Sequence, residues 1–171
     1  GARQDSVALT SYNPSWQYRF QLEVIALRRA LKSPNLNIEH IGSTAIPDIS
    51  AKPVLDMLVA IDGRLETLDL TDALATLAYR CITNDATCKI FVKEKDGIVT
   101  HHLTFTSPDS SLWKEAIEFR DRMINYPQWA KRYEAEKLRL AQLYPFNSEG
   151  YAEARANFIE SILTSPNELL E

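Results

Sequence analysis

The chain contains 171 residues, 45% of them hydrophobic and 25% charged, which is the composition of an ordinary globular domain with a sizeable core. A net charge of −4 argues against a general nucleic-acid-binding surface, and two cysteines are too few for a disulfide scaffold or a four-thiolate zinc site. No apolar run is long enough to cross a bilayer and no signal peptide opens the chain, so we expect a single domain over residues 1–171, located in the cytoplasm and without a membrane partner.

The first predicted element of regular structure is a helix. Asn13 suits the N-cap position and Pro14 suits the first turn. The helix should end at the Ser-Pro-Asn segment 33–35, and residues 7–9 before it are expected to form an edge strand. Apolar side chains at helical spacing support the helix: Trp16, Phe20, Val24, Leu27 and Leu31.

Two β-permissive segments follow, separated by a Gly-Ser turn. Residues 38–41 form the first, Gly42 and Ser43 end it, and residues 54–61 form a second run that is apolar except for Asp56. A carboxylate inside a buried strand is costly unless a cation, a metal ion or hydrogen bonds satisfy it. Asp56 is therefore expected to have a specific partner.

The rest of the chain is expected to form one helix, a strand hairpin and three further helices. These segments are residues 65–79, then 87–93 and 98–105 with a turn at 94–97, then 107–125, 128–144 and 151–163. The order predicts an α+β fold, in which helices cover a small mixed sheet and the C-terminal third is helical.

The strand periodicity makes Asp56 and His102 a candidate pair. Successive strand residues point to opposite faces, so Thr100, His102 and Thr104 share one face while His101 lies among apolar residues on the other. Asp56 meets His102 if their strands are close in the sheet. Such a pair is interpreted either as a catalytic or metal site or as an ion pair that only satisfies a buried carboxylate, and His101 as a packed core histidine.

The residues Gly42, Ser43 and Thr44 form a candidate phosphate-binding turn. Their small size lets backbone N–H groups and a hydroxyl approach phosphate oxygens, although turns use glycine and serine constantly. Twelve residues separate Ser43 from Asp56 at the start of the next strand. A phosphate tail at the turn would then lie within reach of a metal ion held by Asp56.

Two basic residues are candidates for contacting that phosphate. Lys52 precedes Pro53 at the mouth of the second strand, where a solvated lysine is an equally good interpretation. Arg120 falls on the apolar side of its helix, an unusual place for a guanidinium without a partner. Four side chains of the last two helices are expected to be structural: the solvated Lys137 and Arg155, and the core residues Tyr133 and Tyr151.

The segment H-I-G-S-T-A-I-P-D-I-S-A-K-P-V-L-D at 40–56 resembles the signature of the GrpB family. Further matches are residues 12–16, 101–103, 119–121, Tyr133 with Lys137, and 151–163. The family is regarded as a branch of the nucleotidyltransferase superfamily, and some members are fused to dephospho-coenzyme A kinase. The resemblance implies a nucleotidyltransferase-like fold, a nucleoside triphosphate and Mg²⁺. By position, Gly42 and Ser43 match the phosphate-binding pair and Asp56 matches the first metal-binding carboxylate.

The chain departs from that pattern at three positions, one of which is Asp48, where relatives commonly have glycine. The superfamily usually has a second acidic residue two positions after the first, and Leu58, which provides no oxygen ligand, stands there. GrpB relatives often have the sequence His-His-Leu-His, and here the fourth position of that motif is Thr104. A metal site made of Asp56, His102 and the nearby Glu39 would be mixed N/O, and it would suit Mn²⁺ or Zn²⁺ at least as well as Mg²⁺.

Together these features predict a metal-dependent nucleotidyltransferase that acts on a small acceptor. Asp56 and His102 would be catalytic, with a divalent Mg²⁺ or Mn²⁺ ion, and Gly42, Ser43, Thr44, Lys52 and Arg120 would bind the nucleoside triphosphate. An alternative is a non-catalytic domain that binds a nucleotide or phosphorylated small molecule, as Leu58 suggests. A third is a structural domain in which Asp56 and His102 are only a buried pair.

Overall fold

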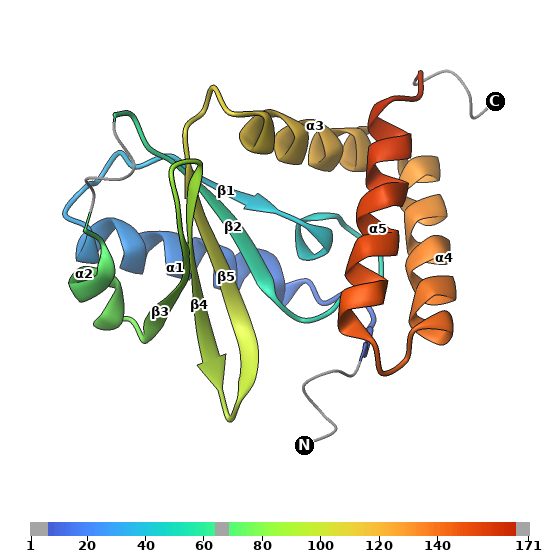
Figure 1. Cartoon of the computed structure of the whole chain (residues 1–171), viewed down its shortest axis with the longest axis horizontal. Helices are drawn as coiled ribbons and strands as arrows, with labels where there is room; N and C mark the ends of the chain where they lie inside the picture. Colours follow the sequence, from blue (N-terminus) through green and yellow to red (C-terminus); the bar gives the residue numbers. More distant parts are fainter. Residues whose placement is uncertain (1–6, 64–68, 167–171) are drawn as a thin grey trace.

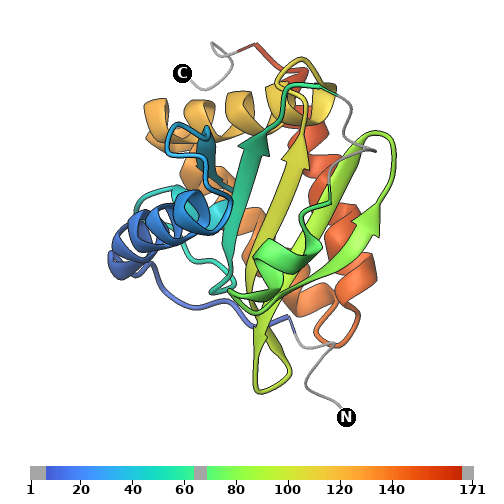
Figure 2. The same cartoon turned by 90° about the vertical axis from the view of Figure 1, so that its left-hand side faces the viewer.

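The computed structural model describes residues 7–63 and 69–166, which form a mixed α+β fold around a five-stranded sheet (Figure 1). The strand order is β1-β2-β5-β4-β3. Helices α1 and α2 lie in front of the sheet in Figure 2, whereas α3, α4 and α5 lie behind it. The predicted α+β fold with a helical C-terminal third is therefore confirmed.

The described part of the chain contains five α-helices, five strands and one short 3₁₀ turn. The helices are α1 (Ser15–Ala30), α2 (Thr71–Ala75), α3 (Ser111–Asn125), α4 (Pro127–Leu143) and α5 (Ser148–Leu163). The strands are β1 (Ile38–Ile41), β2 (Leu55–Ala60), β3 (Tyr79–Asn84), β4 (Cys88–Lys95) and β5 (Ile98–Thr106), and the turn is η1 (Ser43–Ala45). We call residues 46–54, between η1 and β2, the connector.

The main apolar core lies between the sheet and α1 and α2. Strand residues of one parity point into it, and Trp16 and Leu27 of α1 cover them. Its strand members are Ile38, Leu55, Met57, Val59, Tyr79, Phe91, Leu103 and Phe105. Because this face takes the apolar residues of β2 and β5, Asp56 and His102 must point to the opposite face, toward α3, α4 and α5.

The sheet register places Ile41, Asp56 and His102 side by side on three adjacent strands. Strand β2 pairs antiparallel with β1, so that Ile41 is opposite Asp56. It pairs parallel with β5, so that Asp56 is opposite His102. The prediction that Asp56 and His102 share a face of neighbouring strands is confirmed.

The start of α1 also follows the sequence signal, with a shift of one residue. The helix begins at Ser15 with Pro14 at the N-cap position, and the Asn13 side chain accepts a hydrogen bond of 2.9 Å from the Ser15 backbone N–H. Asn13 therefore satisfies one of the free N–H groups at the helix start, as expected of a capping residue.

The prediction of one helix over residues 65–79 is wrong at its C-terminal end. The described part of that segment contains only the short helix α2, and Tyr79 begins strand β3, which the sequence analysis did not predict. Ala78 has a φ of 66°, which ends the helical turn. Strand β3 is an edge strand whose polar side chains are mostly exposed, so it lacks the alternation by which half-buried strands are recognised. Residues 64–68 of the predicted helix lie outside the described residues.

The N-terminal segment does not form the predicted edge strand. Residues 7–9 have no strand structure, and Thr10 makes an isolated two-hydrogen-bond bridge with Ala51 of the connector, with both N···O distances 2.9 Å. The segment nevertheless matters for the site, because the bridge holds Leu9 beside the connector.

None of the helices within residues 7–63 and 69–166 is long and apolar enough to span a membrane.

His101 is not the apolar core histidine that the sequence predicted. It faces α1, where its Nε2 atom lies 3.6 Å from Glu23 Oε2. The same glutamate accepts hydrogen bonds of 2.7 Å from Tyr79 and from Lys93. His101 therefore belongs to a polar cluster on the face of the sheet opposite His102.

Candidate functional site

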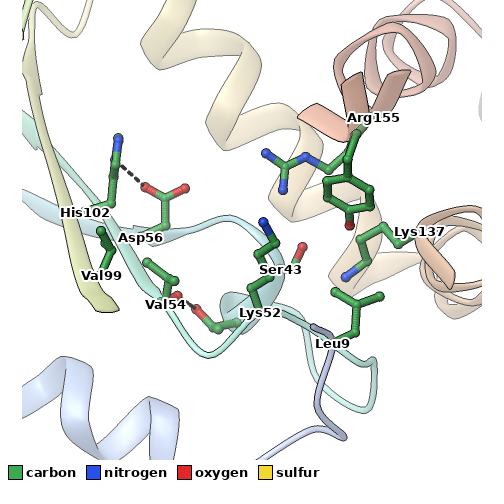
Figure 3. A pocket seen from close by; sticks show the side chains of 11 residues that line it. Leu9, Ser43, Lys52, Val54, Asp56, Val99, His102, Lys137 and Arg155 are labelled. Atoms are coloured by element: carbon green, nitrogen blue, oxygen red, sulfur yellow. Dashed lines mark hydrogen bonds and ion pairs between the residues drawn. The ribbon is translucent and has the colours of Figure 1, made fainter. Parts of the chain in front are cut away.

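A cavity of about 320 Å³ lies between the sheet and the helices α4 and α5. Figure 3 shows Asp56 and His102 on one side of it, Lys137 and Arg155 on the other, and Ser43 and Lys52 between them. The lining residues come from seven parts of the fold, namely the N-terminal segment, η1, the connector, β2, β5, α4 and α5: Leu9, Ser43, Thr44, Lys52, Val54, Asp56, Val99, His102, Lys137, Tyr151 and Arg155. The cavity thus collects most of the candidate residues and adds others from the C-terminal helices.

Gly42 brings the turn backbone into direct contact with Asp56. It has a φ of 70°, a conformation that residues with a side chain rarely adopt. A Cβ atom on Gly42 would lie 2.9 Å from Asp56 Oδ2. The glycine is needed at this position both for its backbone conformation and for the space that the carboxylate occupies.

The turn after Gly42 is held in place by its own side chains. The Thr44 hydroxyl donates to the Val54 carbonyl at 3.0 Å, so its oxygen must accept the 2.9 Å hydrogen bond that joins it to His40 Nε2. This assigns a neutral His40 with the proton on Nε2, and burial lowers the pKa of His40 to about 4. Thr44, predicted as a ligand-binding residue, is 1% exposed and uses its hydroxyl to fix the turn.

The Ser43 hydroxyl is more available than that of Thr44. It lies 3.3 Å from the hydroxyl of Tyr133, a buried residue of α4, and it lines the cavity. Tyr133 packs against Phe119 and Phe158, as expected for a core tyrosine. Its hydroxyl nevertheless connects the helical layer to the turn, which explains how α4 sets the position of Ser43.

Asp56 and His102 approach each other at the edge of the cavity. His102 Nδ1 lies 3.4 Å from Asp56 Oδ1, and both side chains are a little more than one third exposed. Within the described residues, His102 Nδ1 is buried and makes no hydrogen bond. The imidazole and the carboxylate therefore face each other at the cavity edge without a well-aligned hydrogen bond between them.

Lys137 is buried, contrary to the prediction that it is solvated. Its side chain is 1% exposed, its Nζ donates to the Ser50 carbonyl, and it lies 4.8 Å from the centre of the Tyr133 ring. The sequence carried a signal for this, because Lys137 continues the buried stripe of α4 formed by Tyr133 and Leu140. The burial of Lys137 was not predicted, because a lysine side chain is usually exposed to solvent.

Arg155 and Lys52 complete the basic wall of the cavity. Arg155 is half-buried rather than solvated, and its guanidinium lies 5.6 Å from the centre of the Tyr151 ring. Lys52 Nζ lies 5.2 Å from the same ring, and burial together with Arg155 lowers the pKa of Lys52. Lys52, Lys137 and Arg155 come from the connector, α4 and α5, so only the tertiary fold brings these three cations together.

Glu39 and Arg120, predicted as metal ligand and phosphate ligand, pair with each other instead. Arg120 Nη1 lies 2.6 Å from Glu39 Oε2 and 3.1 Å from the His40 carbonyl oxygen, and neither Glu39 nor Arg120 lines the cavity. Arg120 therefore ties α3 to β1. Its place on the apolar side of α3 is explained by this partner on the sheet.

The predicted metal set of Asp56, His102 and Glu39 is consequently not assembled. Within residues 7–63 and 69–166, no three His, Cys, Asp or Glu side chains are grouped so that they could hold a metal ion. Leu58 is fully buried and offers no oxygen. Asp56 and His102 are only two potential ligand side chains, which is too few to hold a pair of ions.

The family model described as GrpB protein matches residues 6–165. The chain belongs to the GrpB family. This confirms the relationship that the segment at 40–56 indicated, and that segment contributes Ser43, Thr44, Lys52, Val54 and Asp56 to the cavity.

The similarity to individual GrpB proteins extends over most of the chain. The chain is 31% identical over 167 residues to UPF0157 protein PA4798 of Pseudomonas aeruginosa, and the matched region covers 95% of this chain and 68% of that protein. The crystal structure of conserved protein GrpB from Enterococcus faecalis has a TM-score of 0.75 at 26% identity and covers 91% of this chain and 99% of that chain. Cid1 poly(U) polymerase with MgGTP bound reaches a TM-score of 0.46 at 16% identity over 84% of this chain and 50% of that chain, too weak a likeness to establish a shared site.

Proposed function

We propose that the cavity binds a nucleoside triphosphate or another phosphorylated small molecule. The observation that carries this proposal is the convergence of Lys52, Lys137 and Arg155 on one cavity wall, beside the Ser43 hydroxyl. Three basic side chains in a partly enclosed space are stabilised in their charged forms by an anion, and phosphate groups are the multivalent anions that such a wall suits. The GrpB signature, whose superfamily acts on nucleoside triphosphates, supports the same ligand class.

Asp56, with His102 beside it, would hold one divalent ion, Mg²⁺ or Mn²⁺, next to the phosphates. The ion supplies charge neutralisation on the phosphate oxygens. Gly42 brings Asp56 against the turn backbone, Ser43 offers a hydroxyl to the ligand, and Lys52 and Arg155 offset the remaining phosphate charge.

The reaction that this arrangement suits is nucleotidyl transfer to a small acceptor. His102 is the group placed to accept a proton from an acceptor hydroxyl, because its imidazole lines the cavity beside Asp56. Substrate binding at the basic wall would orient the phosphate chain toward Asp56.

A second candidate is a domain that binds the same ligand without turnover. The buried Leu58 favours it, because the site lacks the second carboxylate that two-ion transfer uses. Both candidates share the ligand class and differ only in whether pyrophosphate is released.

Binding is tested by thermal unfolding and calorimetry with MgATP, MgGTP, MgCTP and MgUTP. A ligand at about one hundred times its Kd should stabilise the folded state by about 2.7 kcal/mol. Arg155→Met should reduce the stabilisation strongly, whereas Arg139→Met, which removes an exposed arginine of α4, should leave it unchanged. If no nucleotide or other phosphorylated ligand stabilises the protein, the proposed ligand class is wrong.

Transfer is tested by measuring metal-dependent pyrophosphate release in the presence of small hydroxyl and amine acceptors. Release that Asp56→Ala abolishes supports the transferase. Ligand binding without release, by the unmodified protein in Mg²⁺ and in Mn²⁺, supports the non-catalytic domain. Equal release by the wild type and by Asp56→Ala would remove Asp56 from the mechanism.

A further inference from the structure

Lys137 is the most deeply buried basic side chain of the cavity wall, and its surroundings disfavour a charge. It is 1% exposed, and its amine donates to the neutral carbonyl of Ser50. Among the residues that the structure describes, no carboxylate forms an ion pair with Lys137. A buried ammonium with one neutral hydrogen-bond partner is costly, so this amine gains little from being charged while the cavity is free of anions.

The nearby positive charge of Arg155 also disfavours a charged Lys137. Burial and the nearby Arg155 lower the pKa of Lys137 to about 7, against a smaller opposite effect of Glu134. The Glu134 carboxylate also accepts a 3.0 Å hydrogen bond from the Ser50 hydroxyl. The titratable groups that face Lys137 or its cavity are Tyr133 and Glu134 of α4, Tyr151 and Arg155 of α5, Lys52 of the connector, Asp56 of β2 and His102 of β5.

Tyr151 provides an independent sign of a missing ligand at the same wall. The residue is 1% exposed and lines the cavity, and no group in the described part of the chain accepts a hydrogen bond from its hydroxyl. Burial raises the pKa of Tyr151, so the hydroxyl keeps its proton at neutral pH and can donate it. A buried donor without an acceptor is rare in folded proteins, and an anionic oxygen in the cavity would supply one.

We propose that Lys137, Arg155 and the Tyr151 hydroxyl form a subsite for the terminal dianionic phosphoryl group of the ligand, and that the Lys137 amine takes up one proton from solvent as that group binds. The proposal rests on the proposed function and specifies its ligand further, as one ending in a phosphoryl group. The phosphoryl charge provides the counter-ion that Lys137 lacks, so the ammonium becomes favourable only in the complex. Arg155 and the Tyr151 hydroxyl provide two further hydrogen-bond donors to the same group.

The first test is the affinity for MgATP between about pH 7 and about pH 9, measured by calorimetry. The second pKa of a phosphate is about 6, so the probe is fully ionised over this range and does not itself change the affinity. Linkage of one proton to binding predicts that the affinity falls with pH, approaching about tenfold per pH unit at the alkaline end. Calorimetry in two buffers of different ionisation enthalpy should report uptake of up to about one proton at the alkaline end of the range.

Four variants assign the effect. Lys137→Met should weaken MgATP binding and remove the pH dependence of the affinity. Tyr151→Phe should weaken MgATP binding but leave the pH dependence of the affinity unchanged. Lys131→Met, which removes an exposed lysine of the same helix, should change neither. If Lys52→Met removes the pH dependence and Lys137→Met retains it, the assignment to Lys137 is wrong.

A ligand-independent test uses lysine labelled with ¹³C and follows the Cε signals of the wild-type protein by NMR. One signal, absent from Lys137→Met or Lys137→Arg, should titrate near neutral pH and move to higher pH when MgATP is added. If Lys137 instead titrates in the alkaline range typical of a solvated lysine, the proposal is overturned even if MgATP binds. If neither MgATP nor inorganic tripolyphosphate binds the wild type at all, the subsite falls together with the proposed function.

Discussion

Gly42, directly after β1, is in contact with Asp56 of the neighbouring strand β2. The Asp56 carboxylate occupies the space that a side chain at position 42 would need. The distance from an added Cβ to Asp56 Oδ2 would be 2.9 Å, closer than Cβ atoms approach oxygens in folded proteins. The glycine at the end of β1 therefore determines where the carboxylate of β2 lies. The turn and the acidic residue form one structural unit, although thirteen residues separate them in the chain.

The variant Gly42→Ala tests this unit. It combines the strain of a φ of 70° with the clash against Asp56, and we expect a loss of more than about 1 kcal/mol in the free energy of unfolding, measured by urea denaturation. Gly97→Ala is the matched control, because Gly97 has a φ of 77° and nothing within 4 Å of an added Cβ. Equal losses for both variants would mean that the contact with Asp56 contributes nothing.

The buried His40 predicts a pH dependence of stability. Its pKa is about 4 in the folded protein and 6.5 when unperturbed, so the unfolded state binds more protons between these values. Stability should therefore be fully present above about pH 6.5 and fall as the pH drops toward 4, by about 3 kcal/mol from this residue. Urea denaturation at several pH values measures it.

The control for His40 is His40→Gln, which cannot titrate in this range and keeps a nitrogen donor for Thr44. The carboxylates of the protein also titrate near pH 4, so the relevant quantity is the difference between wild type and variant. That difference should change steadily from about pH 6.5 to about pH 4. A constant difference would contradict a neutral His40 in the folded state.

The ion pair of Arg120 and Glu39 should stabilise the joint between α3 and β1. A double-mutant cycle with Arg120→Met and Glu39→Gln is expected to give a coupling of about 1 kcal/mol, because the two side chains are only 16% and 33% exposed. Arg120→Met should cost more than Glu39→Gln, since it also removes the donor to the His40 carbonyl.

The exposed ion pair of Arg80 and Glu94 provides the comparison. Its N···O distance of 2.7 Å is close to the 2.6 Å of the Arg120–Glu39 pair, but its arginine is 60% exposed. Water screens such a pair, so a cycle with Arg80→Met and Glu94→Gln should show a smaller coupling. A larger coupling in the exposed pair would contradict the role given to Arg120.

The errors of the sequence analysis have a common physical origin. Strand β3 was missed because it lies at the edge of the sheet, where only tertiary pairing with β4 stabilises a polar segment. Lys137 was placed in solvent because a charge usually stays there, although its neighbours on α4 are buried. Glu39 was placed at the metal site by its closeness to the turn in sequence, whereas Arg120, eighty-one residues later, binds it.

The sequence by itself determined the α+β class, the order of most elements, the family, and the turn and strand that carry Ser43 and Asp56. These features depend on local spacing, since the period of apolar residues and the turn residues act through near neighbours. Only the tertiary structure decided that Lys52, Lys137 and Arg155 share a cavity with Asp56 and that Glu39 and Arg120 do not. The composition of that cavity depends on how α4 and α5 pack behind the sheet. This packing brings together side chains that are far apart in the sequence, and local sequence spacing does not reveal such contacts.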